Sequence, residues 1–243
     1  MTAALVQSGP MTTSGATVSC SSTGAGNLLV LLVVVSPANS TPPAGWSQAV
    51  AAAGGGFMQI WYYPNNPGGI TSVVFTGTSP NITIGAILEF SGLDTTAPLD
   101  KTGSVADNTG TTSPINISTS SAITANDELA VTILNINTSA VKITITPGTG
   151  FTQAGQIGNG VKQTQHNAYD YRLDTGASSS GTTITDAMAI SATGWTTITG
   201  IIATFKLPSA AAGLLPQQER HRVPITVPPY GRVMRHSPAT YGR

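Results

Sequence analysis

The sequence of 243 residues has a formal net charge of zero and is poor in charge: Lys, Arg, Asp and Glu make up 8% of it, against about a quarter in an average globular protein. Its 27 glycines and 16 prolines are typical of a β-protein with many turns, and its Val, Ile and Leu runs exclude a wholly disordered chain. A single cysteine, Cys20, excludes an internal disulfide and a cysteine metal site, and the N-terminus lacks the segments of an ordinary signal peptide.

The predicted elements are strands throughout the chain. Residues 28–35 form a continuous apolar run, which suits a central strand covered on both faces and is far shorter than the about 20 residues of a membrane span. Residues 82–90 and 141–146 alternate between apolar and polar side chains, as half-buried strands do. Turn sequences rich in Gly, Pro, Asn and Ser separate these runs, and no stretch has the spacing of an amphipathic helix. The sequence therefore predicts an all-β fold without a membrane partner.

The chain also matches itself, which predicts an internal duplication with one copy at 1–98 and the other at 99–207. Four pairs of segments follow in the same order: AGNLLVLLVVV with ANDELAVTILN, PPAGWSQA with PGTGFTQA, IWYYP with AYDYR, and GAILEF with GIIATF. In the third pair Ile60 falls on Ala168. Two arrangements fit: one jelly-roll-like sandwich with strands of both copies in each sheet, or two tandem immunoglobulin-like domains. We expect the single large sandwich, because no polar linker separates the copies.

The strand pattern stops after Lys206, where residues 208–213 predict a hinge and residues 214–243 an extended arm with five prolines. The arm carries five arginines and one glutamate, a net charge of +4, whereas residues 1–213 have a net charge of −4. Opposite charges favour binding of the arm to an acidic surface, such as a neighbouring copy. The segment RVPITV suits addition to a sheet edge, and YGR occurs twice. The predicted partner-binding residues are Arg220, Arg222, Val223, Ile225, Val227, Tyr230, Arg232, Arg235, Tyr241 and Arg243.

Candidate catalytic groups are few. The body contains a single histidine, His166, which on a strand shares a face with Asp170 and Arg172. We expect this face to be exposed, with an ion pair between Asp170 and Arg172, in preference to a ligand or metal contact. The matching face of the first copy, Met58, Ile60 and Tyr62, is a candidate contact face for another subunit.

No nucleophile, zinc or nucleotide motif is present, and Glu89 has no obvious acidic partner for a glycosidase pair. We therefore expect no enzyme, no catalytic residues, no cofactor and no metal. Nucleic acid is disfavoured because the arm has no lysine and only two tyrosines for stacking.

The motifs GNLLVLLVV, PPAGW, IWYY, ILEFSGLDTTAPLD and GWTTITGIIATFK cover most of residues 25–206. In them the body resembles a β-sandwich domain of tailed-bacteriophage virion structural proteins of the minor tail, fibre or capsid-decoration type. The resemblance implies a structural or adhesive part of the particle, located in the virion, and carries no catalytic residues.

The expected function is thus a non-enzymatic virion structural protein whose arm binds other virion proteins and copies of itself. The alternative is a carbohydrate-binding or adhesion module for a surface glycan, with aromatics such as Trp61 or Tyr62 stacked on sugars. A glycan-degrading enzyme is a third hypothesis.

Overall fold

The computed structural model describes residues 2–36, 40–52, 57–107, 113–158 and 160–209. Every regular element in these ranges is a β-strand, which confirms the all-β prediction. The chain divides into one unit of residues 1–209 and a second of residues 210–243, so the division falls inside the predicted hinge. The predicted arm lies outside the described residues.

Two five-stranded antiparallel sheets form the middle of the described part. The first sheet has the order β1 (Ala4–Ser8), β7 (Asn81–Ser91), β3 (Leu28–Ser36), β5 (Met58–Tyr63) and β4 (Ser47–Ala51). The second sheet has the order β8 (Leu99–Asp107), β15 (Trp195–Phe205), β10 (Leu129–Lys142), β13 (Lys162–Arg172) and β12 (Thr152–Ile157).

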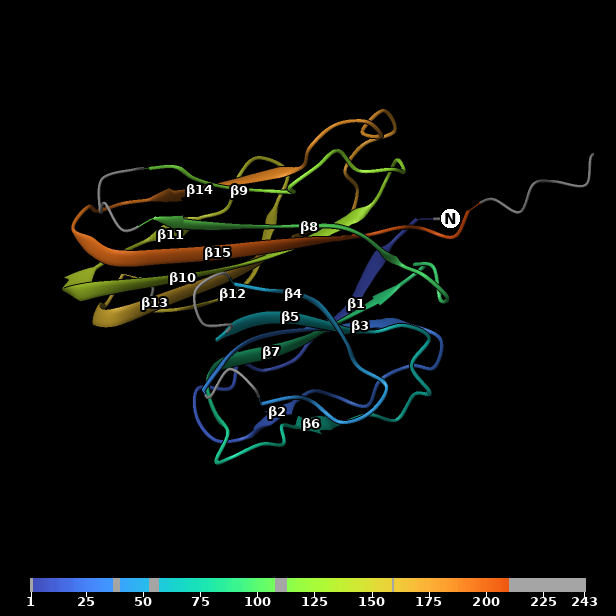
Figure 1. The fold of residues 1–243 in the computed structure, drawn as a ribbon, viewed down its shortest axis with the longest axis horizontal. Helices are drawn as coiled ribbons and strands as arrows, with labels where there is room; N and C mark the ends of the chain where they lie inside the picture. The colour runs from blue at the N-terminus through green and yellow to red at the C-terminus, as the bar shows by residue number, and fades with distance from the viewer. Residues whose placement is uncertain (1, 37–39, 53–56, 108–112, 159, 210–243) are drawn as a thin grey trace, which may run out of the picture. The chain divides into compact units, whose positions relative to one another are not determined.

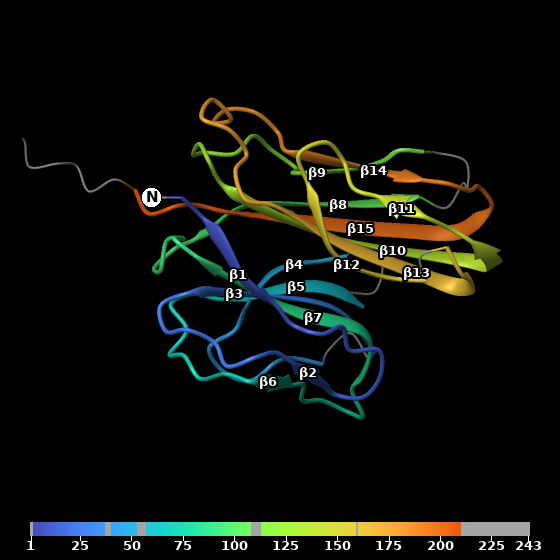
Figure 2. The same ribbon diagram turned by 180° about the vertical axis from the view of Figure 1, so that it is seen from behind.

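Small outer sheets cover the far face of each large sheet. Strands β2 (Thr17–Ser19) and β6 (Ser72–Val74) cover the first sheet, and strands β11 (Ile145–Thr146), β14 (Thr185–Ile190) and β9 (Ile115–Ser118) cover the second. Figures 1 and 2 show the resulting four layers from opposite sides, with β2 and β6 at one end of the stack and β9, β11 and β14 at the other. We call residues up to β7 the first half and residues from β8 to 209 the second half.

Three hydrophobic cores fill the spaces between the four layers. The central core lies between the two five-stranded sheets and contains side chains of both halves. Within it the rings of Tyr62 and Phe205 meet edge to face at 5.6 Å, and those of Phe90 and Tyr171 at 5.8 Å. Each half also has its own core, between its large sheet and its outer sheet.

Strand β3 explains why the two halves need each other. Leu28, Val30 and Leu32 face the central core, whereas Leu29 and Leu31 face the core of the first half, and all five are at most 2% exposed. The prediction of a central strand covered on both faces is confirmed. Because the outer sheet can cover only one face, the second face has to be buried against the other half.

The distribution of strands corrects one expectation. Each large sheet contains strands of one half only, so the prediction that each sheet would combine strands of both copies is wrong. The halves are not independent tandem domains either, since the central core joins them. The two sheets do follow the same order, from β1 or β8 at one edge to β4 or β12 at the other, as a duplication would produce. The duplication itself and the jelly-roll topology stay predictions.

Backbone pairing shifts part of the sequence match by one residue. Leu28 pairs with Phe90 on β7, as Leu129 pairs with Phe205 on β15, so β3 and β10 correspond with an offset of 101 residues, and not 100. On β5 and β13, Ile60 then corresponds to Tyr169 and not to Ala168. Since successive strand residues point to opposite faces, this one-residue slip reverses which side chains share a face.

The sequence match pairs Gly85 with Gly200, and the backbone pairing places these two glycines at equivalent positions of their sheets. The structure shows why both positions carry glycine. A Cβ atom on Gly85 would lie 2.7 Å from Cγ2 of Val18, and one on Gly200 would lie 2.7 Å from Cδ1 of Ile117. At the same position of each half, the outer sheet therefore approaches the large sheet too closely for a larger side chain.

Candidate functional site

The expected exposed face of β13 does not exist. His166 and Asp170 are both 0% exposed, because β13 is an inner strand of its sheet with a neighbouring layer on each face. Arg172 is directed to the following loop, where its Nε donates to the carbonyl of Asp174 at 2.7 Å and its Nη2 to that of Thr175 at 2.9 Å. The prediction of an exposed Asp170 to Arg172 ion pair is wrong.

His166 lies between two backbone carbonyls. Its Nδ1 is 2.9 Å from the oxygen of Gly158 and its Nε2 is 3.1 Å from that of Val141. Both ring nitrogens thus have backbone partners and tie strand β10 to the turn before β13. Within the described ranges, no three His, Cys, Asp or Glu side chains gather closely enough to hold a metal ion.

The candidate contact face of β5 is occupied within the chain. Met58 is 3% and Ile60 is 0% exposed, and both belong to the central core. Tyr62 is half-buried and packs against Phe205 of the second half. This face is therefore covered by the chain's own second half and is not open to another subunit.

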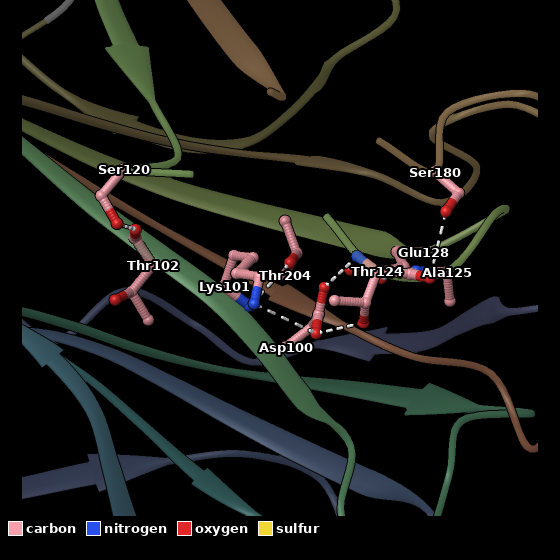
Figure 3. Close-up of polar contacts among 9 residues, drawn as sticks. All are labelled: Asp100, Lys101, Thr102, Ser120, Thr124, Ala125, Glu128, Ser180 and Thr204. Atoms are coloured by element: carbon pink, nitrogen blue, oxygen red, sulfur yellow. Dashed lines mark hydrogen bonds and ion pairs between the residues drawn. The ribbon is translucent and has the colours of Figure 1, made fainter. Parts of the chain in front are cut away.

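The polar cluster that the sequence did not single out lies at one end of the second half, and we call it the acid cluster (Figure 3). It consists of Asp100 on β8, Thr124 and Glu128 in the segment before β10, and Thr204 on β15. Thr124 donates to Asp100 twice, from its backbone N–H at 2.6 Å and its hydroxyl at 2.5 Å. The segment before β10 is thereby fastened to the edge strand β8.

Glu128 lies at the centre of the acid cluster and is 0% exposed. Its Oε1 accepts from the N–H of Ala125 at 3.1 Å, and its own N–H donates to Oγ1 of Thr175 at 2.9 Å. Ser180 adds a second link, because its hydroxyl donates to the carbonyl of Thr124 at 3.1 Å. The cluster therefore also binds the loop that follows β13.

The two carboxyl groups of the acid cluster differ in protonation. Burial raises the pKa of Glu128 to about 7, and the nearby charge of Asp100 also raises it, although hydrogen bonds with Thr204 and Ala125 lower it. Burial also opposes ionisation of Asp100, but hydrogen bonds from Thr124 and Glu128 and the charge of Lys101, 3.9 Å away, leave the pKa of Asp100 lowered. A proton on Glu128 shared with ionised Asp100 accounts for both directions.

At the matching end of the first half, one buried carboxylate occupies the place of the acid cluster. Glu89, at the position of Thr204, is 0% exposed and accepts hydrogen bonds from Gln7 Nε2 at 2.6 Å, Gly24 N–H at 2.7 Å and Asn27 Nδ2 at 2.6 Å. It therefore has three donors, and among the described residues no second carboxyl group forms a pair of the glycosidase kind with it. In both halves the buried acid holds loops against the end of the large sheet.

An open hollow lies next to the acid cluster. It is lined by Arg172 and by residues 175–179 and 182–185, most of which carry hydroxyl groups. Thr175, which accepts from Glu128, belongs to this lining, so the acid cluster supports the loop that forms the hollow. One guanidinium among hydroxyls offers hydrogen-bond donors and acceptors to a polar ligand.

The aromatic side chains proposed for sugar stacking are engaged elsewhere. Trp61 is half-buried, packs against the core of the first half and donates from Nε1 to Oε1 of Gln59 at 2.7 Å. Tyr62 lies against the central core. The predicted partner-binding residues of the arm lie outside the described residues: Arg220, Arg222, Val223, Ile225, Val227, Tyr230, Arg232, Arg235, Tyr241 and Arg243.

The sequence held a weak signal for the acid cluster. Asp100 ends the motif FSGLDTTAPLD, and Glu128 precedes an apolar run, but the two lie 28 positions apart in the sequence. Only the pairing of β8, β10 and β15 in one sheet brings them together.

Comparisons with protein-family models, curated proteins and solved structures found no match. In the part of the chain that the structure describes, no helix is long and apolar enough to cross a membrane.

Proposed function

We propose that this chain is a non-enzymatic structural protein of a bacteriophage virion, either a capsid-decoration protein or a minor tail or fibre component. Its C-terminal arm binds neighbouring subunits. The observation that carries the proposal is the contrast between a self-contained acidic body and a basic segment that follows it. The body ends at residue 209 with a net charge of −4, and the arm has a net charge of +4.

The way the body uses its acids supports a structural role. Glu89 and Glu128 are 0% exposed, and each is bonded to the loops of its own half. A substrate has no access to a carboxyl group in such a position, so these groups serve to stabilise the fold. The resemblance of the body to phage virion proteins supports the particle as the location.

A carbohydrate-binding module is the second candidate, and the hollow beside the acid cluster favours it. Arg172 and the surrounding hydroxyls suit the hydrogen bonds that sugar hydroxyl groups make. The half-buried state of Trp61 and Tyr62 weakens this candidate, because a stacking platform has to be open to the sugar face.

The first experiment replaces the five arginines of the arm by glutamine in the full-length chain and measures incorporation into particles, together with self-association by sedimentation. We expect the variant to fold but to lose incorporation or self-association, and we expect added salt to weaken the wild-type interaction. A control replaces Lys142 and Lys206 of the body by glutamine and retains binding. Equal incorporation of both variants at all salt concentrations contradicts the proposal.

A glycan array separates the two candidates. The adhesion hypothesis requires that the wild-type chain binds a glycan. The Arg172→Ala variant should then lose this binding, and the variant without the arginines of the arm should keep it. The structural hypothesis predicts no glycan signal that depends on Arg172.

A further inference from the structure

The core of the second half contains a second pair of acids, Asp170 on β13 and Asp186 on β14. Both residues are 0% exposed. Asp186 accepts from the hydroxyl of Thr132 at 2.7 Å and from the N–H of Gly148 at 2.8 Å, so both of its oxygens have donors. Neither oxygen of Asp170 accepts a full hydrogen bond from the described residues. A buried carboxylate with no donor is among the most costly groups in a protein interior.

The first half places apolar side chains at the matching positions. Cross-strand pairing sets Thr132 opposite Asp170, as it sets Leu31 opposite Trp61 in the first half. In the outer sheets Asp186 pairs with Ile117, as Val73 pairs with Val18. The first half therefore fills this space with Leu31, Trp61 and Val73, all packed in or against its core. The acid pair is a feature of the second half that the shared fold does not require.

We infer that Asp170 and Asp186 share one proton in the folded chain, and that loss of this proton loosens the outer sheet, which makes the second half a pH-sensitive element. A proton on Asp170 satisfies its orphaned carboxyl group by donation to Asp186. It also removes one of two like charges from the core. Gln153, which pairs with Asp170 across β12 and β13 and whose Nε2 lacks a full hydrogen bond, can then donate to the remaining oxygen.

The groups around the pair support this assignment. The hydrogen-bonding groups around the two carboxyls are Thr132 from β10, Gln153 from β12 and the Gly148 N–H from the turn before β12. The charged group that affects the pKa of Asp170 is Asp186. Among the described residues no cation compensates the pair. Burial and, to a smaller extent, the charge of Asp186 raise the pKa of Asp170 and Gln153 lowers it, which together place this pKa at about 8. Burial raises the pKa of Asp186 too, but its donors Thr132, Gly148 and Asp170 act in the opposite direction, so the proton resides on Asp170.

The sign of the effect follows from the raised pKa of Asp170. The stabilising contribution is fully present below the ordinary pKa of 3.8 and is lost as the pH rises through about 8. Between these limits the folded chain holds one proton more than the unfolded chain. The unfolding equilibrium constant should then increase about tenfold for each pH unit through this residue alone.

The test measures urea unfolding of the full-length chain from about pH 5 to about pH 9 for wild type, Asp170→Asn and the control Asp94→Asn. The side-chain amide introduced by Asp170→Asn can donate to Asp186 at every pH, so we expect this variant to lose the tenfold factor per pH unit. Asp94 is a surface carboxyl with a lowered pKa, so its variant should keep the wild-type slope in this range. Both variants retain Glu128, and the difference between the slopes therefore isolates Asp170.

The carboxyl ¹³C resonances can be measured on the wild-type chain alone, so this test does not require that any variant folds. One aspartate should titrate with a midpoint near 8, far above the surface carboxyl groups. Parallel slopes for wild type and Asp170→Asn, or the absence of any aspartate that titrates above about pH 6, would overturn the inference. Stabilisation of wild type by millimolar CaCl₂ that Asp170→Asn abolishes would also overturn it, since the pair would then hold a cation in place of the proton.

Discussion

Truncation of Phe205 to alanine tests whether the two halves share one central core. Phe205 is 0% exposed, lies on β15 of the second half and packs its ring against Tyr62 of the first half. A buried phenylalanine removes about 150–250 Å² from water, worth about 4–6 kcal/mol at about 25 cal/mol per Å², and an edge-to-face ring pair adds about 1 kcal/mol. The alanine methyl group and partial collapse of the cavity recover some of this. We therefore expect Phe205→Ala to lower the free energy of unfolding by about 4 kcal/mol, within the usual range for such truncations.

Urea unfolding combined with native-state hydrogen exchange measures this loss in each half separately. Because the central core is common to both halves, the amides of β3 and of β10 should lose the same amount of protection. Phe57→Ala is the matched control, since Phe57 is 49% exposed and its truncation should cost less than about 1 kcal/mol. If β10 loses protection while β3 keeps it, the halves unfold independently and the shared-core reasoning is refuted.

Three further predictions concern single positions. Gly200→Ala forces a Cβ atom against the buried Ile117 side chain and should destabilise the chain by about 1–3 kcal/mol in urea unfolding; a loss below about 0.5 kcal/mol would mean that this side chain moves aside freely. Asn66→Ala removes a side chain that is 1% exposed and donates to the carbonyls of Gly24 and Asn27, so its melting temperature should fall by an amount equivalent to about 2–4 kcal/mol, and an unchanged melting temperature contradicts the assigned bonds. Glu128→Gln should flatten the pH dependence of stability, because the raised pKa of Glu128 makes wild type lose stability as the pH rises from 4.5 through about 7; retention of the wild-type slope in that window argues against a proton on Glu128.

Much of the fold could be predicted from local pattern. The eight apolar residues 28–35 predicted a strand with two buried faces, and the structure confirms this. The match between GAILEF and GIIATF pairs Gly85 with Gly200, and each of them lies where the outer sheet of its own half approaches the large sheet closely. These predictions succeeded because each depends on residues within a single strand, namely an unbroken apolar run in one case and a glycine in the other.

The candidate site could not be predicted in the same way. Matching Ile60 with Ala168 in place of Tyr169 pairs the face of Met58, Ile60 and Tyr62 with the face of His166 and Asp170, although it corresponds to the face of Tyr169, which packs into the central core. Asp170 is expected in solvent because surface ion pairs such as one between Asp170 and Arg172 are common, whereas the structure buries Asp170 completely. A shared proton is an alternative to a cation, and nothing in the residues adjacent to Asp170 indicates it.

The sequence by itself determined that the chain is built of strands, which of them are apolar on both faces, and where a basic segment follows an acidic body. Only the tertiary structure decided what covers the second apolar face, because that depends on how two distant sheets pack. It also decided which carboxyl groups meet. Asp170 and Asp186 come from different strands, and Asp100 on β8 meets Glu128 in the segment before β10. Their protonation depends on distances and burial that arise only when these segments are placed side by side.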